Sequence, residues 1–332
     1  MVVTLKEVAQ RAGVSRSAVS RTFTPGASVS AKTRAKVEAA AKDLGYQPNA
    51  LASSLTTGRT KLIGLVSDNF HNPFFLQIFD LFTRGLQDRG LRPLLVNLSG
   101  QTDPLGSVQM LQQYSVDGVV VASSTLPPEF SMAFLEAGLS VVNAFGRCGD
   151  DPMVHVVGID DVASGAMAAR ELMDRGYRHV GFLGGPKGAT STRDRLRGFQ
   201  ETIADNHDMT LSTAFASNYT FDAGRAEMQR LLSGTRAQAY FCGDDVISIG
   251  ALSAIADAGL SCPADIGLIG VNDMEMAGWQ NINLTTLRQP IDQIVDSVIE
   301  TMVQLTQNAG LDPEARVLEC TLVERGTLRP KP

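Results

Sequence analysis

Four hydrogen-bonding side chains near the amino terminus have the spacing to share one face of a short helix. They are Arg16, Ser17, Ser20 and Arg21. The apolar Ala18 and Val19 lie between them and would point the other way, into a core. An arginine can donate two hydrogen bonds to guanine O6 and N7, and a serine can bond a base edge or a phosphate. These residues therefore have the chemistry to read a DNA major groove if a helix presents them.

The surrounding residues predict a helix-turn-helix that would do so. Thr4 and Glu7 fit a capping box at the start of a first helix. Gly13 tolerates the left-handed conformation that a tight turn needs. Ser15 is a suitable N-cap for a second helix over roughly 16–23. A helix, a glycine-containing turn and a second helix together make this motif.

A third helix and the charge distribution support this interpretation. We expect the helix over roughly 31–44, capped by Ser30 and stopped by Gly45, with Ser30 and Lys32 near phosphates. Residues 1–60 carry nine Lys and Arg against three Asp and Glu, a net +6, whereas the remainder carries a net −12. A basic head on an acidic body is typical of nucleic-acid-binding proteins. The alternative is a helical bundle with a solvated basic face, which the agreeing caps, turn and charge disfavour.

The segment after the third helix predicts a short fourth helix. Pro48 ends what precedes it, and Asn49 can cap a helix over about 50–55. A helix of this length is unstable alone in water, so it should form only when something packs against it. Its Leu55 has the character of the apolar wedges that minor-groove proteins insert between base steps.

The head and this segment resemble the LacI/GalR (lactose-repressor/galactose-repressor) family of bacterial regulators. The strings that carry the resemblance are TLKEVAQRAGVS, VSRTF, VSAKTRAKVEAA, LGYQPNALA and KLIGLV. The resemblance implies that the short segment is a hinge helix, which pairs with its dimer mate in the operator's minor groove with Leu55 at the wedge position. Ser53 stands where the family often has Arg after the hinge alanine, a change that would weaken a phosphate contact or shift operator preference. The residues expected to contact DNA are Thr4, Ser15, Arg16, Ser17, Ser20, Arg21, Ser30, Lys32, Asn49, Ala52, Ser53 and Leu55.

The rest of the chain predicts an α/β core with two lobes and parallel sheets. Apolar runs alternate with amphipathic stretches after residue 61, as parallel sheets covered on both faces require. The expected strands are Leu62–Val66, Pro93–Leu98, Gly118–Ala122, Val141–Phe145, His155–Ile159, Val180–Leu183, Ala239–Cys242 and Ile266–Val271. Expected helices include 73–89, 161–175, 222–233, 246–258 and 290–306.

The family resemblance continues through this body and implies a periplasmic-binding-protein-like core. Its familiar stretches are NPFF, VDGVVV, HVGFLGGP, RLRGF, FCGDD, PADIGLIGVNDMEMA and LTTLRQP. Crossovers near 160, 290 and 320 would divide this core. The expected organisation is a helix-turn-helix domain at 1–48, a hinge helix and linker at 49–60, and an effector-binding core at 61–330, with an N-subdomain of about 61–160 and 291–320 and a C-subdomain of about 161–290 and 321–330.

Polar residues follow many of the predicted strands, where ligands of open α/β sheets bind. Arg195 is the strongest candidate, because a buried arginine needs an acceptor and its fork suits a carboxylate or vicinal hydroxyls. Asp245 and Asp273 are expected to cap the helix or turn that follows, and Phe75 could equally belong to the core. The resemblance places effector-binding residues at Phe74, Phe75, Ser124, Arg147, Asp160, Ser191, Arg195, Tyr219, Asp244 and Asn272.

Asn272 departs from the family pattern, because members that bind neutral sugars usually carry Asp there. An amide both donates and accepts hydrogen bonds and has no charge. With Arg147 and Arg195 nearby, we expect the cleft to tolerate an anion. The expected effector is a sugar, a sugar acid or another small hydroxylated metabolite, with a nucleobase-like effector as the alternative.

The sequence offers little support for catalysis, a metal or a cofactor. Neither GxGxxG, GxxxxGK[ST] nor GxSxG is present, and the four histidines lack metal-ligand spacing. The four cysteines form no CxxC and are typical of reduced thiols. A secreted solute-binding protein is disfavoured, because MVVTLKEVAQR does not resemble a signal peptide, and no 18-residue apolar run suggests a membrane span.

These features together predict a cytoplasmic DNA-binding regulator without a cofactor. The resemblance implies a homodimer that reads two half-sites of a pseudo-palindromic operator and responds to a small-molecule effector. No leucine heptads follow Leu328, which favours a dimer over a tetramer. Repression is the expected output, with activation as the alternative.

Overall fold

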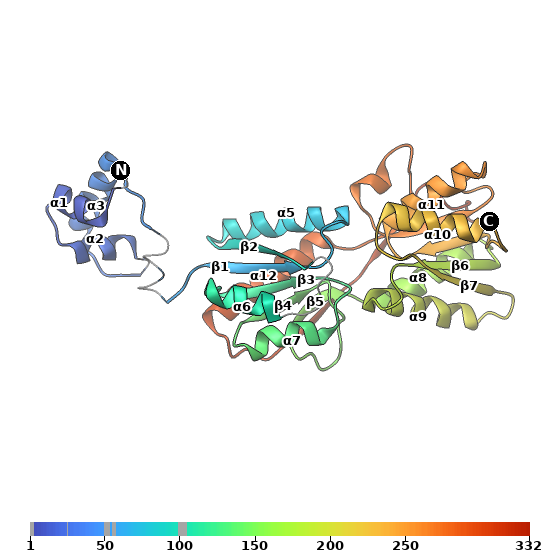
Figure 1. The fold of residues 1–332 in the computed structure, drawn as a ribbon, viewed down its shortest axis with the longest axis horizontal. Coiled ribbons are helices and arrows are strands. Elements are labelled where there is room, and N and C mark those ends of the chain that lie inside the picture. Colours follow the sequence, from blue (N-terminus) through green and yellow to red (C-terminus); the bar gives the residue numbers. More distant parts are fainter. Residues whose placement is uncertain (1–2, 25, 50–53, 55–57, 99–104) are drawn as a thin grey trace. The chain divides into compact units, whose positions relative to one another are not determined.

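The computed structural model describes residues 3–24, 26–49, 54, 58–98 and 105–332. The chain divides into two compact units, Met1–Lys61 and Leu62–Pro332, each described here by itself (Figure 1). No described helix has the length and apolar character that crossing a membrane requires.

The described residues of the first unit form three helices at the predicted positions, whereas most of the fourth helix expected over about 50–55 lies outside the described residues. The three helices are α1 (Leu5–Ala12), α2 (Arg16–Phe23) and α3 (Ala31–Leu44). Val8, Val19 and Val37, one from each helix, are fully buried where the three helices meet. This small core fixes the angle between α1 and α2 and so the face that α2 presents.

Capping interactions define where these helices begin and end. Thr4 accepts a hydrogen bond from the Glu7 amide at 3.4 Å, and the Thr4 amide donates to the Glu7 carboxylate at 2.7 Å, so the predicted capping box is confirmed. Ser15 and Ser30 accept hydrogen bonds from backbone amides three residues later and cap α2 and α3. Gly13 has a φ of 66°, the left-handed conformation expected in the turn after α1.

The second unit contains two six-stranded sheets, one in each lobe (Figure 1). The sheet of lobe one has the order β11-β5-β4-β3-β1-β2, and all of its strands are parallel. Its strands are β1 (Leu62–Ser67), β2 (Arg92–Asn97), β3 (Gly118–Ala122), β4 (Val141–Ala144), β5 (His155–Ile159) and β11 (Ala315–Leu318).

The sheet of lobe two has the order β12-β10-β9-β8-β6-β7. It is parallel except where β12 pairs with β10. Its strands are β6 (His179–Gly184), β7 (Thr210–Phe215), β8 (Ala239–Cys242), β9 (Gly267–Asn272), β10 (Thr286–Arg288) and β12 (Thr321–Val323). Every predicted strand overlaps an observed one, which confirms the two-lobed architecture with mostly parallel sheets.

Helices cover both faces of each sheet. Lobe one has α5 (Pro73–Asp88), α6 (Leu105–Gln113), α7 (Pro128–Glu136) and α12 (Ile291–Gln307). Lobe two has α8 (Asp161–Asp174), α9 (Thr190–Ala204), α10 (Phe221–Leu232), α11 (Asp245–Asp257) and the short 3-10 helix η1 (Glu275–Gly278). Along β3, Val120 packs in the cluster that contains α5 and α12, whereas Val119 and Val121 pack in the cluster that contains α6 and α7. Burial on both faces explains why the strands are apolar throughout.

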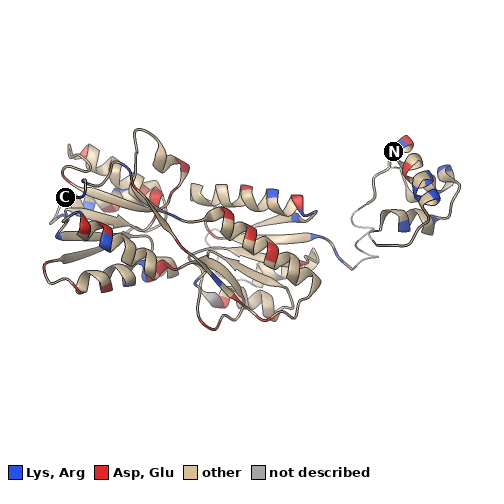
Figure 2. Cartoon of the chain, turned by 180° about the vertical axis from the view of Figure 1, so that it is seen from behind, with Lys and Arg blue, Asp and Glu red and all other residues tan. Residues whose placement is uncertain are grey.

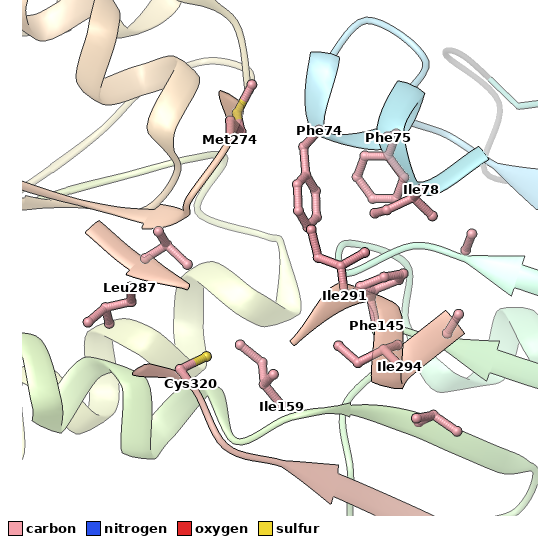
Figure 3. Packing of buried hydrophobic residues seen from close by; sticks show 14 of the residues in the cluster. Phe74, Phe75, Ile78, Phe145, Ile159, Met274, Leu287, Ile291, Ile294 and Cys320 are labelled. Atoms are coloured by element: carbon pink, nitrogen blue, oxygen red, sulfur yellow. The ribbon is translucent and has the colours of Figure 1, made fainter. Parts of the chain in front are cut away.

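The chain passes between the lobes at three places, between β5 and α8, between β10 and α12, and between β11 and β12. Buried apolar side chains pack beside these crossovers, with Phe74 and Phe75 of α5 near Ile291 of α12, and Leu287 on the side of lobe two (Figure 3). The carboxyl ends of the strands in both sheets face this region, which is where a ligand of an open α/β sheet binds.

Candidate functional site

The outer face of α2 carries the side chains that the sequence predicted to read DNA. Arg16, Ser17 and Arg21 are exposed, and Ser20 is half-buried. The Ser17 hydroxyl lies 2.9 Å from that of Ser15, and Arg21 Nε donates to the Ser17 carbonyl at 3.4 Å. Figure 2 shows the Lys and Arg positions of this unit as blue segments along its helices. The arrangement is a polar helix face backed by a packed core.

The third helix holds this face in place and adds further polar groups. Arg34 of α3 donates to the Thr22 carbonyl of α2 at 2.9 Å. Lys32 is exposed in the first turn of α3, two residues after Ser30. Thr4 and Asn49 are also exposed, whereas Ala52, Ser53 and Leu55 lie outside the described residues.

The second unit has a small, largely enclosed pocket between its lobes. The residues that line it are Asn69, Asn72, Phe74, Phe75, Ser124, Phe145, Ile159, Asp161, Arg195, Tyr219, Asp244, Asn272 and Gln289. Seven of the ten residues expected to bind an effector are among them, namely Phe74, Phe75, Ser124, Arg195, Tyr219, Asp244 and Asn272. The structure thus brings together side chains from segments nearly 200 residues apart.

Arg195 lies at the wall of this pocket and is paired with an acid. Its Nε donates to Asp161 Oδ1 at 2.7 Å, and its Nη1 donates to the Gly243 carbonyl at 2.6 Å. The side chain is only 4% exposed. Burial raises the pKa of Asp161, while the adjacent Arg195 charge opposes that shift. The ion pair fixes the guanidinium plane, and it also offsets the arginine charge.

Two glycines bring α8 and α9 close enough for this pair to form. A Cβ on Gly165 of α8 would lie 2.0 Å from the Arg195 carbonyl, and a Cβ on Gly198 of α9 would lie 1.9 Å from the Val162 carbonyl. Any larger residue would therefore separate the helices. Glycine at these positions is what places Asp161 beside Arg195.

Asp244 accepts hydrogen bonds from both lobes. Its Oδ2 accepts from Asn72 Nδ2 in lobe one and from Asn272 Nδ2 in lobe two, each at 2.9 Å. Its Oδ1 accepts from the Val246 amide at 2.7 Å and caps α11. Burial raises the pKa of Asp244 to about 6, although these hydrogen bonds oppose the shift. Gln289, from the crossover before α12, donates to Asn272 Oδ1 at 2.7 Å and fixes the orientation of its amide.

Asn272 and Asp273 both have positive φ values, 118° and 55°, so β9 ends in a sharp bend. Non-glycine residues rarely adopt this conformation, and the surrounding hydrogen bonds must hold it. Asp273 accepts from Arg288 and Arg325, each at 2.6 Å. The bend turns the Asn272 side chain toward the pocket and Asp273 away from it.

The neighbouring Asp245 has a structural role. It is fully buried, and its carboxylate accepts from the Met274 amide at 2.8 Å and from Thr286 Oγ1 at 2.6 Å. These bonds join α11 to the end of β9 and to β10. The expectation that Asp245 and Asp273 are structural is confirmed, but as links between elements, since Asp244 is the residue that caps α11.

Tyr219 and Ser191 form a buried hydroxyl cluster beside the pocket. The Tyr219 hydroxyl lies 2.7 Å from Thr192 Oγ1 and 3.2 Å from Ser191 Oγ. A Cβ on Gly185 would lie 2.3 Å from the Tyr219 ring, so glycine at this position lets the ring approach the backbone closely. Ser191 does not line the pocket, and it supports Tyr219 from behind.

Arg147 and Asp160 also do not line this pocket, although the resemblance places them among the effector-binding residues. Asp160 is exposed and caps α8, accepting from the Ala163 amide at 2.9 Å. Arg147 makes two hydrogen bonds to Asp194, at 2.6 and 2.7 Å. Both residues line a neighbouring, more open pocket, which shares Ile159 and Asp161 with the first one. Their side chains are turned toward these protein partners, so Asp161 and not Asp160 meets Arg195.

The sequence analysis missed six pocket residues: Asn69, Asn72, Phe145, Ile159, Asp161 and Gln289. Asn72 had a usable signal, because Asn before Pro at the start of a helix that follows a strand is a typical N-cap. Asp161 begins α8 and Gln289 lies in the crossover before α12, and only the tertiary structure defines where these two side chains point. No cluster of metal-ligating side chains is found in the described part of the chain.

Each of the two units contains a region that matches a known protein family. Residues 4–49 match the family described as bacterial regulatory proteins, lacI family, and residues 169–328 match the periplasmic binding protein-like domain. The chain is 30% identical over 338 residues to the ribose operon repressor of Escherichia coli strain K12, covering 98% of this chain and 100% of that protein. It is also 30% identical over 336 residues to the HTH-type transcriptional repressor PurR of Escherichia coli O139:H28, covering 100% of this chain and 98% of that protein.

Solved structures give the same result. The lac repressor dimer bound to operator and the anti-inducer ONPF matches with a TM-score of 0.88 and 25% identity, over 99% of this chain and 100% of that one. A complex of the transcriptional regulator CelR with cellobiose matches with a TM-score of 0.73 and 27% identity, over 98% of this chain and 99% of that one.

Proposed function

The chain belongs to the lacI family of bacterial regulatory proteins, and we propose that its core senses a neutral, hydroxylated small molecule that controls operator binding by its head. It is a transcriptional regulator and not an enzyme. The proposed output is repression, as in the relatives named ribose operon repressor and PurR. We place the protein in the cytoplasm, where its operator would be.

The charges around the pocket favour a neutral effector. The observation that carries this proposal is the ion pair between Arg195 and Asp161 at 2.7 Å, which offsets the arginine charge. Arg147 is paired outside the pocket and contributes no free positive charge. Asp244, when ionised, leaves the pocket with a formal negative charge, and juxtaposed like charges are unfavourable. An anionic ligand such as a sugar acid, which the sequence analysis also allowed, therefore becomes the second candidate.

The polar groups suit a ligand with several hydroxyls. The Asp244 carboxylate can accept a hydrogen bond from a ligand hydroxyl. Ser124 and Arg195 offer a hydroxyl and a guanidinium at the pocket wall. Phe74, Phe75 and Phe145 supply an apolar surface against which a sugar ring or a nucleobase could pack. The ribose operon repressor and the CelR–cellobiose complex support a sugar.

The DNA-binding part of the proposal rests on α2 and on dimer symmetry. Two heads, each with Arg16, Ser17 and Arg21 in a major groove, would read two half-sites of a pseudo-palindromic operator. The wedge position is assigned to Leu55 between the half-sites. The lac repressor dimer bound to operator is the structural precedent for this arrangement.

The proposed domain organisation follows from these roles. Residues 1–48 form the DNA-binding domain and 49–60 the hinge and linker, while the core from 61 to 330 contains an N-subdomain (about 61–160 and 291–320) and a C-subdomain (about 161–290 and 321–330). Binding of the effector between the subdomains would change how the hinges of the two protomers meet. Linkage makes the effect reciprocal, so an effector that weakens operator binding is itself bound more weakly by the operator complex.

A thermal-shift screen tests the effector class directly. The full-length protein would be heated with neutral sugars, their uronic and aldonic acids, and nucleobases. A ligand at about 100 times its Kd should raise the unfolding midpoint by roughly 5 °C. We expect this shift with a neutral sugar. Shifts from the acids alone, or from the nucleobases alone, would contradict the proposal and identify the correct class.

A further inference from the structure

An ion pair joins the two lobes at the rim of the cleft. Arg147 follows β4 in lobe one, and Asp194 lies in α9 of lobe two. Arg147 Nε donates to Asp194 Oδ2 at 2.6 Å, and Nη2 donates to Oδ1 at 2.7 Å. Asp194 is 9% exposed and Arg147 is 42% exposed, so the carboxylate is held in place while the arginine reaches it from solvent. Bidentate charge-assisted bonds of this kind are the stronger hydrogen bonds in proteins.

The backbone of lobe one is built to present Arg147. Phe145 has a φ of 64°, and its amide donates to the Val157 carbonyl of β5 at 2.8 Å. A Cβ on Gly146 would lie 2.5 Å from the side-chain amide of Asn143, so a larger residue in this turn would displace that side chain. The turn is therefore anchored to the sheet, and Arg147 moves with lobe one as a rigid part of it.

Asp194 is equally fixed to lobe two. It lies one residue before Arg195 on α9, a helix that Gly165 and Gly198 allow to pack closely against α8. Arg197 Nη2, at 3.7 Å from Asp194 Oδ1, is a second and weaker cationic neighbour. Any rotation that opens the cleft must lengthen the distance between Arg147 and Asp194.

The ion pair differs from the other contacts that join the lobes. Thr190 Oγ1 donates to the Ser124 carbonyl at 2.8 Å, and Asn72 donates to Asp244 at 2.9 Å. Ser124, Asn72 and Asp244 all line the pocket, so a ligand can compete with or replace their bonds. Arg147 and Asp194 line the neighbouring pocket and not this one, so their ion pair need not break when this pocket is filled.

We propose that Arg147 and Asp194 form a latch that holds the lobes closed, so that Arg147 controls effector affinity by positioning the lobes and not by touching the effector. The latch itself depends only on the geometry of the core. Its effect on effector affinity rests on the proposed function. Breaking it should lower the ratio of closed to open protein about fivefold, the effect of a partly exposed bidentate pair worth about 1 kcal/mol.

Distance measurement between the lobes in the ligand-free, full-length protein tests the latch. Spin labels would be attached to unnatural amino acids at Glu136 of α7 and Glu201 of α9, both exposed, so that the native cysteines stay unlabelled. Double electron–electron resonance then gives the populations of closed and open forms. The variants are Arg147→Gln, Asp194→Asn and the two combined.

We expect each single variant to shift the population toward the longer distance, and the double variant to shift it no further than either single one. Arg225→Gln is the matched control, because Arg225 forms a similar pair with Asp257 within lobe two. Its distance distribution should equal that of the unchanged protein. Identical distributions in all variants, additive effects of the two changes, or an equal shift in Arg225→Gln would overturn the latch.

The outcome is independent of DNA and effector, so failure of the latch would leave the proposed regulator function intact. Conversely, a protein that binds no operator could still show the latch. Calorimetric titration with whichever sugar the thermal-shift screen identifies completes the test. Asp194→Asn should weaken its binding by about the same factor as Arg147→Gln, since neither side chain contacts it. An effect confined to Arg147→Gln would instead indicate direct contact with the ligand.

Discussion

Asn272 donates its side-chain amide to the carboxylate of Asp244 across 2.9 Å, and the same oxygen accepts from Asn72 of the opposite lobe. Both amides favour the ionised carboxylate, yet burial prevails and raises the pKa of Asp244 to about 6. A carboxyl that titrates near neutrality therefore sits where the lobes meet. Protonation would occupy an oxygen that otherwise accepts hydrogen bonds from both lobes or from an effector.

The first prediction concerns stability and pH. The pKa of Asp244 is higher in the folded chain, about 6, than its ordinary value of 3.8, so the folded state binds more protons between these values. Its contribution to the free energy of unfolding is therefore greatest at low pH and is lost as pH rises from about 4 to 6, by about 3 kcal/mol in all. The pKa values of Asp161 and Asp245 are also raised, so the contribution of Asp244 is obtained as the difference in free energy of unfolding between the unchanged protein and Asp244→Asn. Urea titrations at pH 4, 5, 6 and 7.5 measure it, and parallel curves for the two proteins would contradict it.

Effector binding should depend on pH in the opposite sense. A hydroxyl of the ligand that donates to Asp244 needs the ionised carboxylate, so affinity should fall as pH drops below about 6. The expected loss approaches tenfold for each pH unit once the carboxyl is mostly protonated. Calorimetry with the sugar found in the screen, at pH 5, 6 and 7.5, provides the test. An affinity that is constant over this range would mean that Asp244 does not accept from the ligand.

The close approach of α8 and α9 makes a separate prediction. Gly198→Ala would place a methyl group 1.9 Å from the Val162 carbonyl and force the helices apart. We expect destabilisation of about 1–3 kcal/mol from this overpacking. We also expect weaker effector binding, because Arg195 and Asp161 lie on the separated helices. Gly188→Ala is the control, since nothing lies within 4 Å of its added Cβ. Equal effects of the two substitutions in thermal unfolding and calorimetry would refute the role of this contact.

Residues of the head that contact bases and residues that contact phosphates should affect operator affinity differently as the sequence and the salt concentration change. Arg16→Ala should lower discrimination between operator variants by about 1–3 kcal/mol at the contacted base pair. Lys32→Ala should weaken binding to all sequences alike and reduce the slope of log K against log salt by about 0.9. Gel-shift titrations at several salt concentrations distinguish the two. A uniform loss for Arg16→Ala would reassign that residue to the phosphate backbone.

The fifth prediction concerns the hinge, at a residue outside the described part of the chain. Leu55→Ala should reduce operator affinity about tenfold or more, because the smaller side chain cannot hold open a base step. Effector affinity should stay unchanged. Leu55→Met, which keeps an apolar wedge, is the matched control and should retain most operator binding. Unchanged operator affinity in Leu55→Ala would show that Leu55 does not act as a wedge between base steps.

The sequence predicted the head well because its signals are local. Thr4, Ser15 and Gly13 act within one turn of their own positions, and each was found with the expected hydrogen bond or backbone angle. The core strands were also predictable, since burial on both faces makes them apolar throughout. Because the strands were predictable, the polar residues that follow them were too, and Arg195 and Asn272 were correctly expected near the pocket.

The partners of the site residues could not be predicted, because they depend on distances across the fold. Whether Asp160 or Asp161 meets Arg195 depends on the different directions of neighbouring side chains at the start of α8. It also depends on the close packing of α8 against α9 that the glycines allow. Arg147 was predicted to bind the effector, but its guanidinium is paired with the Asp194 carboxylate. Local sequence indicates which residues are polar and near the cleft, but the charge that a ligand meets is set by such pairings.

The central claim is that occupancy of the core controls operator binding by the head. The direct measurement is a pair of fluorescence-anisotropy titrations on an operator selected by the full-length protein from random-sequence DNA, with and without a saturating sugar identified by thermal shift. We predict a pseudo-palindromic site whose Kd changes at least about fivefold when the sugar is present, in either direction. A protein that selects no sequence, or an operator Kd unchanged by a ligand that demonstrably fills the core, would contradict the account.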